Sequence, residues 1–238
     1  MSVKIITLGF DGPNRSGKAT QCTLLQNWLS ARGVTSLIIR GAGSRPGRGN
    51  QPGDPKSVWW QEVNHWLHAP QTNQEAWHMT SYRLARELVV WRDRALPCIV
   101  RSRGQTGGVL LVDRTLLSRT MIPRAMQNPD VANYLYPEQA RLRGRHITPA
   151  LVCPDLILNL IAPLEVLIAR LDPGDVKYSF RQRLIRETSH WFKDAARYLP
   201  EPLQSRVVEV DASREVDVVF ETVLSVVQSR FECLKCLS

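Results

Sequence analysis

A glycine-rich segment near the start of the chain has the composition of a phosphate-binding loop. Residues 12–19 read GPNRSGKA, with Lys18 directly after the second glycine. Glycines let the backbone curl so that several amide groups face one anion, and the lysine neutralises the terminal phosphates. The segment follows an apolar run, residues 5–10, and opens a helical pattern whose N-terminal dipole also favours an anion. The sequence therefore predicts a polyphosphate site.

One position of this loop departs from the common pattern. Ala19 stands where a serine or threonine hydroxyl usually binds the magnesium ion that bridges the terminal phosphates. Thr20 is about 100° further around the helix and is not expected to replace that hydroxyl. Two alternatives stay open. Either phosphates, water and an acidic residue, Asp11 or Asp113, hold the magnesium, or the chain binds nucleotide and turns it over slowly.

A second motif is a buried strand that ends in an acid. Residues 109–112 are continuously apolar and are followed by Asp113 and Arg114. Beside a phosphate loop, a carboxylate at the carboxyl end of such a strand can orient magnesium or its water shell. The motif is common by chance when it stands alone, so the information lies in its pairing with the loop. We expect Asp113 to be the metal residue.

Short apolar runs alternate with helical patterns along the chain. Continuous apolar runs predict strands buried on both faces of a parallel sheet, and the alternation favours an α/β doubly wound domain. The expected strands are residues 3–10, 35–40, 108–112, 155–161 and 206–211, and the expected helices are 16–32, 75–93, 178–198 and 216–233. Residues 41–56 are expected to be a loop, and residues 125–149 a long connection containing a short helix. Neither reads as a linker, so residues 1–238 are expected to form one domain.

The composition of the 238 residues narrows the class of protein. The net charge is +9, and only six of the 31 basic residues are lysine. Arginine matches phosphate oxygens, so this bias favours phosphate-bearing partners, although an arginine-rich genome gives the same surface. A charged share of 22% excludes general disorder, and no apolar run is long enough to predict a membrane span. Five scattered cysteines and the lack of a signal-peptide pattern predict a cytoplasmic protein.

Taken together, the motifs resemble those of the thymidylate kinase family. Residues 10–21, FDGPNRSGKATQ, look like that family's phosphate loop, and Asp113-Arg114 with Ser118 look like its D-R-Y/H motif. Residues 154–158, PDLIL, and 210–213, VDAS, resemble two later motifs of the family, in the same order. The resemblance covers almost the whole chain. It implies a P-loop kinase fold, with a five-stranded parallel sheet flanked by helices and a lid segment, here residues 171–183.

The resemblance also implies an activity and a role for individual residues. The activity is transfer of the γ-phosphate of ATP to a nucleoside monophosphate, first of all a dTMP-like acceptor, in nucleotide biosynthesis with ATP and Mg²⁺ as cofactors. Catalysis would depend on Lys18, on Arg15, which stabilises transition-state charge, and on Asp113. The implied donor-binding residues are Gly12, Asn14, Ser16, Gly17, Lys18, Ala19, Thr20 and, against the adenine, Arg170. The implied acceptor-binding residues are Asp11, Arg45, Arg83, Arg114 and Ser118.

Four departures from the family pattern concern mainly the acceptor half. Asn14 replaces an aspartate that can accept from the acceptor sugar, Ala19 lacks a hydroxyl, Thr115 replaces an aromatic residue or histidine, and residues 119–127 lack the family's polar-glycine pattern. Two alternatives therefore stay open: a kinase for a different phosphorylated acceptor, and a nucleotide-binding relative with little or no turnover. A nucleic-acid partner ranks last, because basic and aromatic residues do not interleave. A membrane partner is not expected, and a homodimer is left open.

Overall fold

The computed structural model of this chain describes residues 3–40, 88–115, 117–118, 141–142, 145–146, 153–175 and 178–232. Outside these residues lie the expected loop at 41–56, most of the expected helix at 75–93 and most of the connection at 125–149. Arg45 and Arg83, which the resemblance assigns to the acceptor, also lie outside them.

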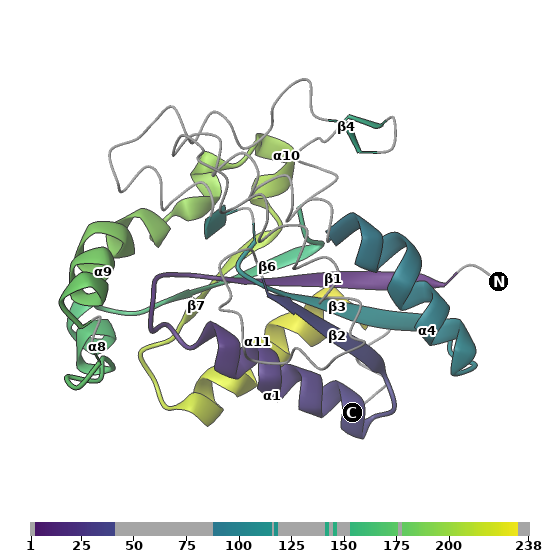
Figure 1. The fold of residues 1–238 in the computed structure, drawn as a ribbon, viewed down its shortest axis with the longest axis horizontal. Coiled ribbons are helices and arrows are strands. Elements are labelled where there is room, and N and C mark those ends of the chain that lie inside the picture. Colours follow the sequence, from purple (N-terminus) through teal and green to yellow (C-terminus); the bar gives the residue numbers. More distant parts are fainter. Residues whose placement is uncertain are drawn as a thin grey trace.

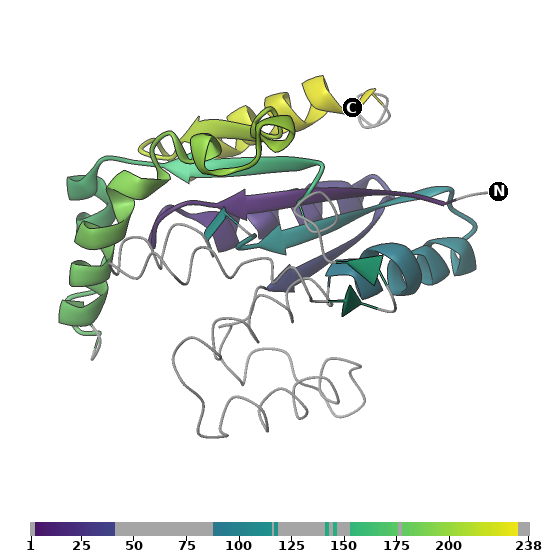
Figure 2. The same cartoon turned by 90° about the horizontal axis from the view of Figure 1, so that it is seen from above.

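The centre of the molecule is one parallel sheet with the strand order β2-β3-β1-β6-β7 (Figures 1 and 2). Its strands are β1 (Lys4–Asp11), β2 (Thr35–Arg40), β3 (Gly107–Asp113), β6 (Leu156–Ile161) and β7 (Val207–Asp211). All five expected strands are confirmed, with ends that agree to within one residue. The strand order reverses at β1, so the loop that leaves β1 emerges between the carboxyl ends of β3 and β6. Ligands of open α/β sheets bind at this type of position.

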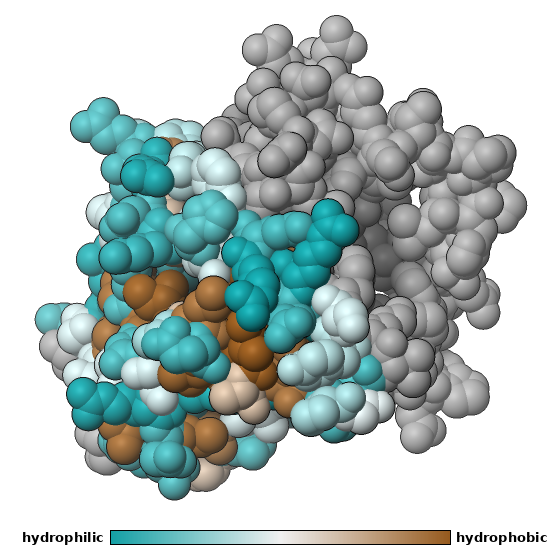
Figure 3. Space-filling view, turned by 90° about the vertical axis from the view of Figure 1, so that its left-hand side faces the viewer, coloured by the Kyte–Doolittle hydropathy of each residue, from teal (hydrophilic) through white to brown (hydrophobic). Residues whose placement is uncertain are grey.

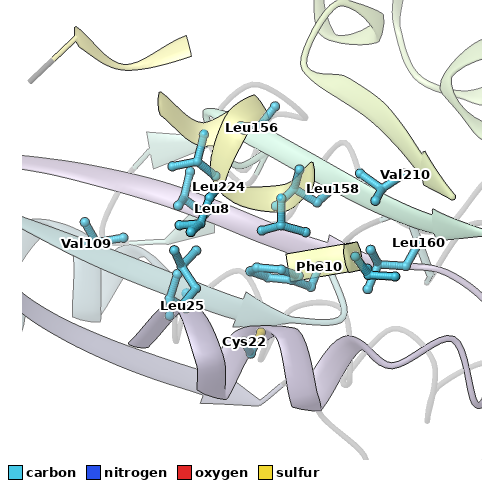
Figure 4. Close-up of a cluster of buried hydrophobic side chains, with 14 of the residues drawn as sticks. Leu8, Phe10, Cys22, Leu25, Val109, Leu156, Leu158, Leu160, Val210 and Leu224 are labelled. Carbon is cyan, nitrogen blue, oxygen red and sulfur yellow. The ribbon is translucent and has the colours of Figure 1, made fainter. Parts of the chain in front are cut away.

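The sheet is covered by helices on both faces, as the continuous apolar runs predict. On one face, α1 (Lys18–Ala31) and α11 (Val216–Arg230) pack against β1, where Leu8 and Phe10 contact Leu25 (Figure 4). On the other face, α4 (Leu96–Ser102) and α10 (Glu201–Gln204) help to bury the alternate residues of the strands, such as Ile157. Burial on both faces is the reason that the central strands β1, β3 and β6 read as largely hydrophobic runs.

The helix that was expected to end at residue 93 continues beyond it, as the described residues from 88 onward show. Residues 88–90 are helical, a π-helical turn follows at Trp91–Ala95, and α4 continues to Ser102. Pro97, in the first turn of α4, has no amide hydrogen to donate to the preceding turn. The wider π-helical turn directly before it lets the chain stay helical, and pattern reading does not anticipate this.

The expected helix at 178–198 is divided in the structure. It consists of α9 (Tyr178–Phe192) and a 3-10 turn (Ala195–Tyr198), separated at Asp194, which has a left-handed backbone with φ 57°. The segment expected to be a lid, residues 171–183, is not one continuous element. Its residues from Tyr178 onward belong to α9.

Two further elements were not expected from the sequence. A short helix, α8 (Leu164–Ala169), precedes the segment that was expected to be a lid, and within the 125–149 connection β4 (Arg141–Leu142) pairs antiparallel with β5 (Arg145–His146). None of the helices in the described ranges is both long enough and apolar enough to cross a membrane.

Candidate active site

The phosphate loop is shaped by three residues with positive φ. Gly12 has φ 132°, Arg15 has φ 67° and Gly17 has φ 90°. Positive φ angles interspersed in this way turn successive amide groups toward one side and form an anion-binding concavity. Gly17 is also the N-cap of α1, so the helix begins at the loop and directs its N-terminal dipole there. The backbone geometry is therefore that of a phosphate site.

Of the two glycines in the loop, Gly12 has the less room for a side chain. An added Cβ would lie 2.2 Å from the carbonyl oxygen of Leu160, a backbone atom of β6 that cannot rotate away. We expect Gly12→Ala to lower the free energy of unfolding by about 1–3 kcal/mol through backbone strain and to weaken nucleotide binding. Thermal unfolding and a nucleotide titration measure both effects. Gly107→Ala is the matched control, since its added Cβ would make an ordinary 3.4 Å contact. An unchanged melting temperature and nucleotide affinity for Gly12→Ala would contradict this account of the loop.

Lys18 lies inside the loop. Its side chain is buried, and its Nζ donates hydrogen bonds to the carbonyl oxygen of Pro13 at 2.5 Å and to Ser16 Oγ at 3.1 Å. Burial, reinforced by the positive charge of Arg114, lowers the pKa of Lys18 to about 7, while the carboxylates of Asp113 and Asp11 act in the opposite direction. A polyphosphate in the loop would favour the charged ammonium, so anion binding and protonation of Lys18 support each other.

Asp11, at the end of β1, is fully buried and bonded within the protein. Its carboxylate accepts hydrogen bonds from the backbone amides of Thr115 and Ser118 at 3.1–3.2 Å, and from both of their hydroxyl groups. The expected contacts of Asp11 and Ser118 with the acceptor, and of Asp11 with magnesium, stay predictions. The oxygens of Asp11 are engaged by the turn that follows β3, so these residues position that turn.

Thr115, which in the sequence is only a departure from the family pattern, stabilises the turn after β3. Its hydroxyl donates to Asp11 and accepts from the amide of Leu117 at 3.1 Å. The hydroxyl thus completes the turn directly after Arg114. The partner residue is more than a hundred positions away in the sequence, so no local signal could have identified the contact.

Arg114 connects the end of β3 to the phosphate loop. Its backbone is left-handed with φ 71°, and its amide donates to the carbonyl oxygen of Phe10 at 2.9 Å. Its guanidinium donates to Oδ1 of Asn14. Asp113 is half-buried at the end of β3. Its negative charge is close enough to Lys18 to oppose part of the lowering of the lysine's pKa. The structure therefore brings Asn14, Lys18, Asp113 and Arg114 together.

The segment that follows α8 also contacts the phosphate loop. Arg170 donates to the backbone carbonyl oxygens of Arg15 at 3.5 Å and Arg214 at 3.4 Å. The guanidinium of Arg15 lies 4.0 Å from the carboxylate of Asp175, which also pairs with Arg181 of α9. Figure 3 views the end of the molecule that carries α8 and α9, where hydrophilic side chains form a band beside an apolar area. Neither Asp175 nor its pairing with Arg181 was expected from the sequence.

The first turn of α1 offers little to a metal ion. Ala19 and Thr20 are both exposed, and the turn contains no acidic residue. Within the described ranges no group of three or more histidine, cysteine, aspartate or glutamate residues could hold a metal.

A five-stranded parallel sheet with a glycine-rich loop leaving its central strand, and an acid at the end of the adjacent strand, defines a P-loop nucleotide kinase fold. No protein-family model matches the sequence. A thymidylate kinase of Thermomicrobium roseum is 28% identical over 232 residues, which cover 92% of this chain and 94% of that protein. A thymidylate kinase of Neisseria gonorrhoeae is 25% identical over 240 residues, which cover 98% of this chain and 100% of that protein.

A solved structure of thymidylate kinase from Candida albicans has the same fold. It superposes with a TM-score of 0.62 at 19% sequence identity and covers 96% of this chain and 93% of its own. The likeness to these curated thymidylate kinases over nearly the whole chain supports its assignment as a divergent member of their family. The resemblance first seen in the motifs is thereby confirmed.

Proposed function

We propose that this protein transfers the γ-phosphate of ATP to a nucleoside monophosphate, with a dTMP-like acceptor as the first candidate. The observation that carries the proposal is the arrangement of Lys18, Arg15 and Arg114 around one anion-binding loop. The sequence likeness supports the same conclusion, because relatives named thymidylate kinases match nearly the whole chain.

The donor side of the reaction is served by the loop. Backbone amides of residues 12–19 and the ammonium of Lys18 hold the β- and γ-phosphates. Phosphoryl transfer requires alignment and neutralisation of charge more than covalent help, and Arg15 supplies the second positive charge on the transferred group. Arg170, bonded to the backbone on either side, is suited to lie against the base of the donor.

On the acceptor side, Arg114 is proposed to bind the monophosphate. Its anchor, Asn14, is neutral, so the guanidinium keeps its full positive charge for a phosphate. An aspartate at the same position would offset part of that charge. Arg45 and Arg83 stay predictions from the family resemblance for the acceptor phosphate and base.

Magnesium fits the site through Asp113 and the phosphates of the nucleotides. Mg²⁺ retains several waters and commonly binds proteins through one or two carboxylates together with substrate phosphates, which matches a single half-buried acid beside the loop. When bound, the ion neutralises charge on the phosphate oxygens. Asp113 would orient the ion or its waters, and Ala19 would contribute no ligand.

Ala19→Ser is expected to restore a hydroxyl ligand for magnesium. We expect the magnesium concentration for half-maximal rate to fall about two- to tenfold, the effect of one added polar contact of about 0.5–1.5 kcal/mol. A magnesium titration of the transfer rate at saturating ATP measures this shift. Ala31→Ser, at the exposed far end of α1, is the matched control and should leave the titration unchanged. An Ala19→Ser curve that superposes on the original would mean that the metal lies away from the start of α1.

A transfer assay over a panel of acceptors tests the proposed function. ATP, magnesium and one of dTMP, dUMP, dCMP, UMP, CMP, AMP or GMP are incubated with the protein, and the nucleoside diphosphates are separated by chromatography. We expect a diphosphate from a pyrimidine monophosphate, with dTMP converted fastest. ATP binding without transfer to any acceptor would contradict the proposal and favour a nucleotide-binding relative without turnover.

A further inference from the structure

A single carboxylate links the phosphate loop to the segment that follows α8. Oδ2 of Asp175 lies 4.0 Å from the guanidinium of Arg15 and forms a closer ion pair with Arg181. Only 21% of the Asp175 side chain and 22% of the Arg181 side chain are exposed, whereas Arg15 is more open to solvent. Asp175 is therefore held firmly by Arg181 and more weakly by Arg15.

The position of Asp175 is fixed by its own turn. The amide of Gly174 donates to the carboxylate of Asp172 at 2.9 Å, and the amide of Asp175 donates to the Asp172 carbonyl oxygen at 3.0 Å. The carbonyl oxygen of Asp175 in turn accepts from the amide of Tyr178, the first residue of α9, at 2.7 Å. A negative charge next to a helix N-terminus is favoured, so the carboxylate is stable in this place.

Two anions can therefore interact with the guanidinium of Arg15. In the proposed reaction its guanidinium meets the γ-phosphate, and in the structure it faces the Asp175 carboxylate. A partly exposed pair at this separation is weak, so a phosphate with more negative charge can take the guanidinium over. The affinity of the protein for the phosphate is nevertheless reduced, because the interaction between Arg15 and Asp175 has to be broken when the phosphate binds.

We propose that Asp175 is a positioning residue that competes with the terminal phosphate of the donor for Arg15. On donor binding, Arg15 passes from the carboxylate to the γ-phosphate, while Asp175 stays paired with Arg181. The inference rests on the proposed function, in which Arg15 meets the transferred group. Its consequence is a selective one: the carboxylate weakens binding of a triphosphate and leaves binding of a diphosphate, which has no γ-phosphate, unaffected.

The test compares the affinities of Asp175→Asn and the unmodified protein for two nucleotides. Calorimetric titrations with a non-hydrolysable ATP analogue and with ADP, both with magnesium, give the four dissociation constants. We expect the analogue to bind Asp175→Asn about two- to fivefold more tightly, the size of an exposed ion pair, and ADP to bind equally well to both proteins. Glu187→Gln is the matched control, because it also removes one negative charge from this region but pairs with Arg183. It should change neither affinity.

Two results would overturn the inference: an analogue affinity that is unchanged or weaker in Asp175→Asn, or an equal gain for the analogue and ADP. Asp175→Ser removes the same charge and keeps a small polar side chain, so it replaces Asp175→Asn in the test if that variant fails to fold. The melting temperatures of both variants are measured. If the unmodified protein binds the nucleotides and the two variants fail to discriminate between them, only the competition is wrong. If the unmodified protein binds neither nucleotide, the proposed function falls with it.

Discussion

Lys18→Ala is expected to lower kcat by at least about 10²–10³-fold, the loss that follows removal of one preorganised charge partner of a transition state. The ammonium of Lys18 lies within the loop and is bonded to Pro13 and Ser16, so it is already placed where the terminal phosphates would bind. Steady-state kinetics with saturating ATP and the best acceptor from the panel measure the effect.

Lys4→Ala is the control for Lys18→Ala. Lys4 is an exposed lysine at the opposite end of β1, and its removal changes the net charge by the same amount. We expect its kinetics to equal those of the original protein. Near-normal turnover of Lys18→Ala would mean that the donor phosphates bind somewhere other than this loop.

Arg15→Asn should be the second variant with a very large loss, about 10³-fold or more in kcat. Asparagine tolerates the left-handed backbone that Arg15 adopts at φ 67°, so the loop keeps its shape while the guanidinium is removed. Because Arg15 is proposed to act on the transition state, kcat should fall much more than the affinity for ADP. Single-turnover rates and ADP titrations separate the two quantities.

Arg32→Gln provides the comparison for Arg15→Asn. Arg32 is an exposed arginine just beyond the end of α1, where it lies over the ring of Trp28. Arg32→Gln removes one positive charge, as Arg15→Asn does, but at a position far from the loop. We therefore expect kcat to stay the same. If Arg15→Asn lost only nucleotide affinity and kept kcat, Arg15 would be a binding residue and the assignment of its role in catalysis would be wrong.

The sheet could be predicted from the sequence because its central strands, β1, β3 and β6, are buried on both faces. In β6, Leu158 faces α11 and Ile157 faces the opposite layer, so the strand appears as an unbroken apolar run. The phosphate loop could be predicted for a similar reason: glycines at positive φ and the adjacent lysine are local in the sequence. Helix ends were less predictable, because the π-helical turn before Pro97 and the break at Asp194 arise from backbone geometry rather than from periodicity.

The contacts that support the loop could not be predicted in the same way. In the sequence, Asp11 is an acid next to a phosphate loop and is therefore read as a ligand. Its hydrogen-bond partners in the structure, Thr115 and Ser118, lie more than a hundred residues away, so the sequence gives no sign of them. Asp175, in contrast, was not a candidate site residue in the sequence. It belongs to an unremarkable polar segment, and its pairing with Arg15 across 160 positions exists only in the folded chain.

The central claim is that the loop at residues 12–19 binds the polyphosphate of the donor, and a crystal structure with a non-hydrolysable ATP analogue and magnesium tests it most directly. The account predicts β-phosphate oxygens within hydrogen-bond distance of the loop amides and of Lys18 Nζ, with the γ-phosphate next to Arg15. An analogue whose phosphates lie outside the loop, with Lys18 still bonded to Pro13 and Ser16, would contradict it.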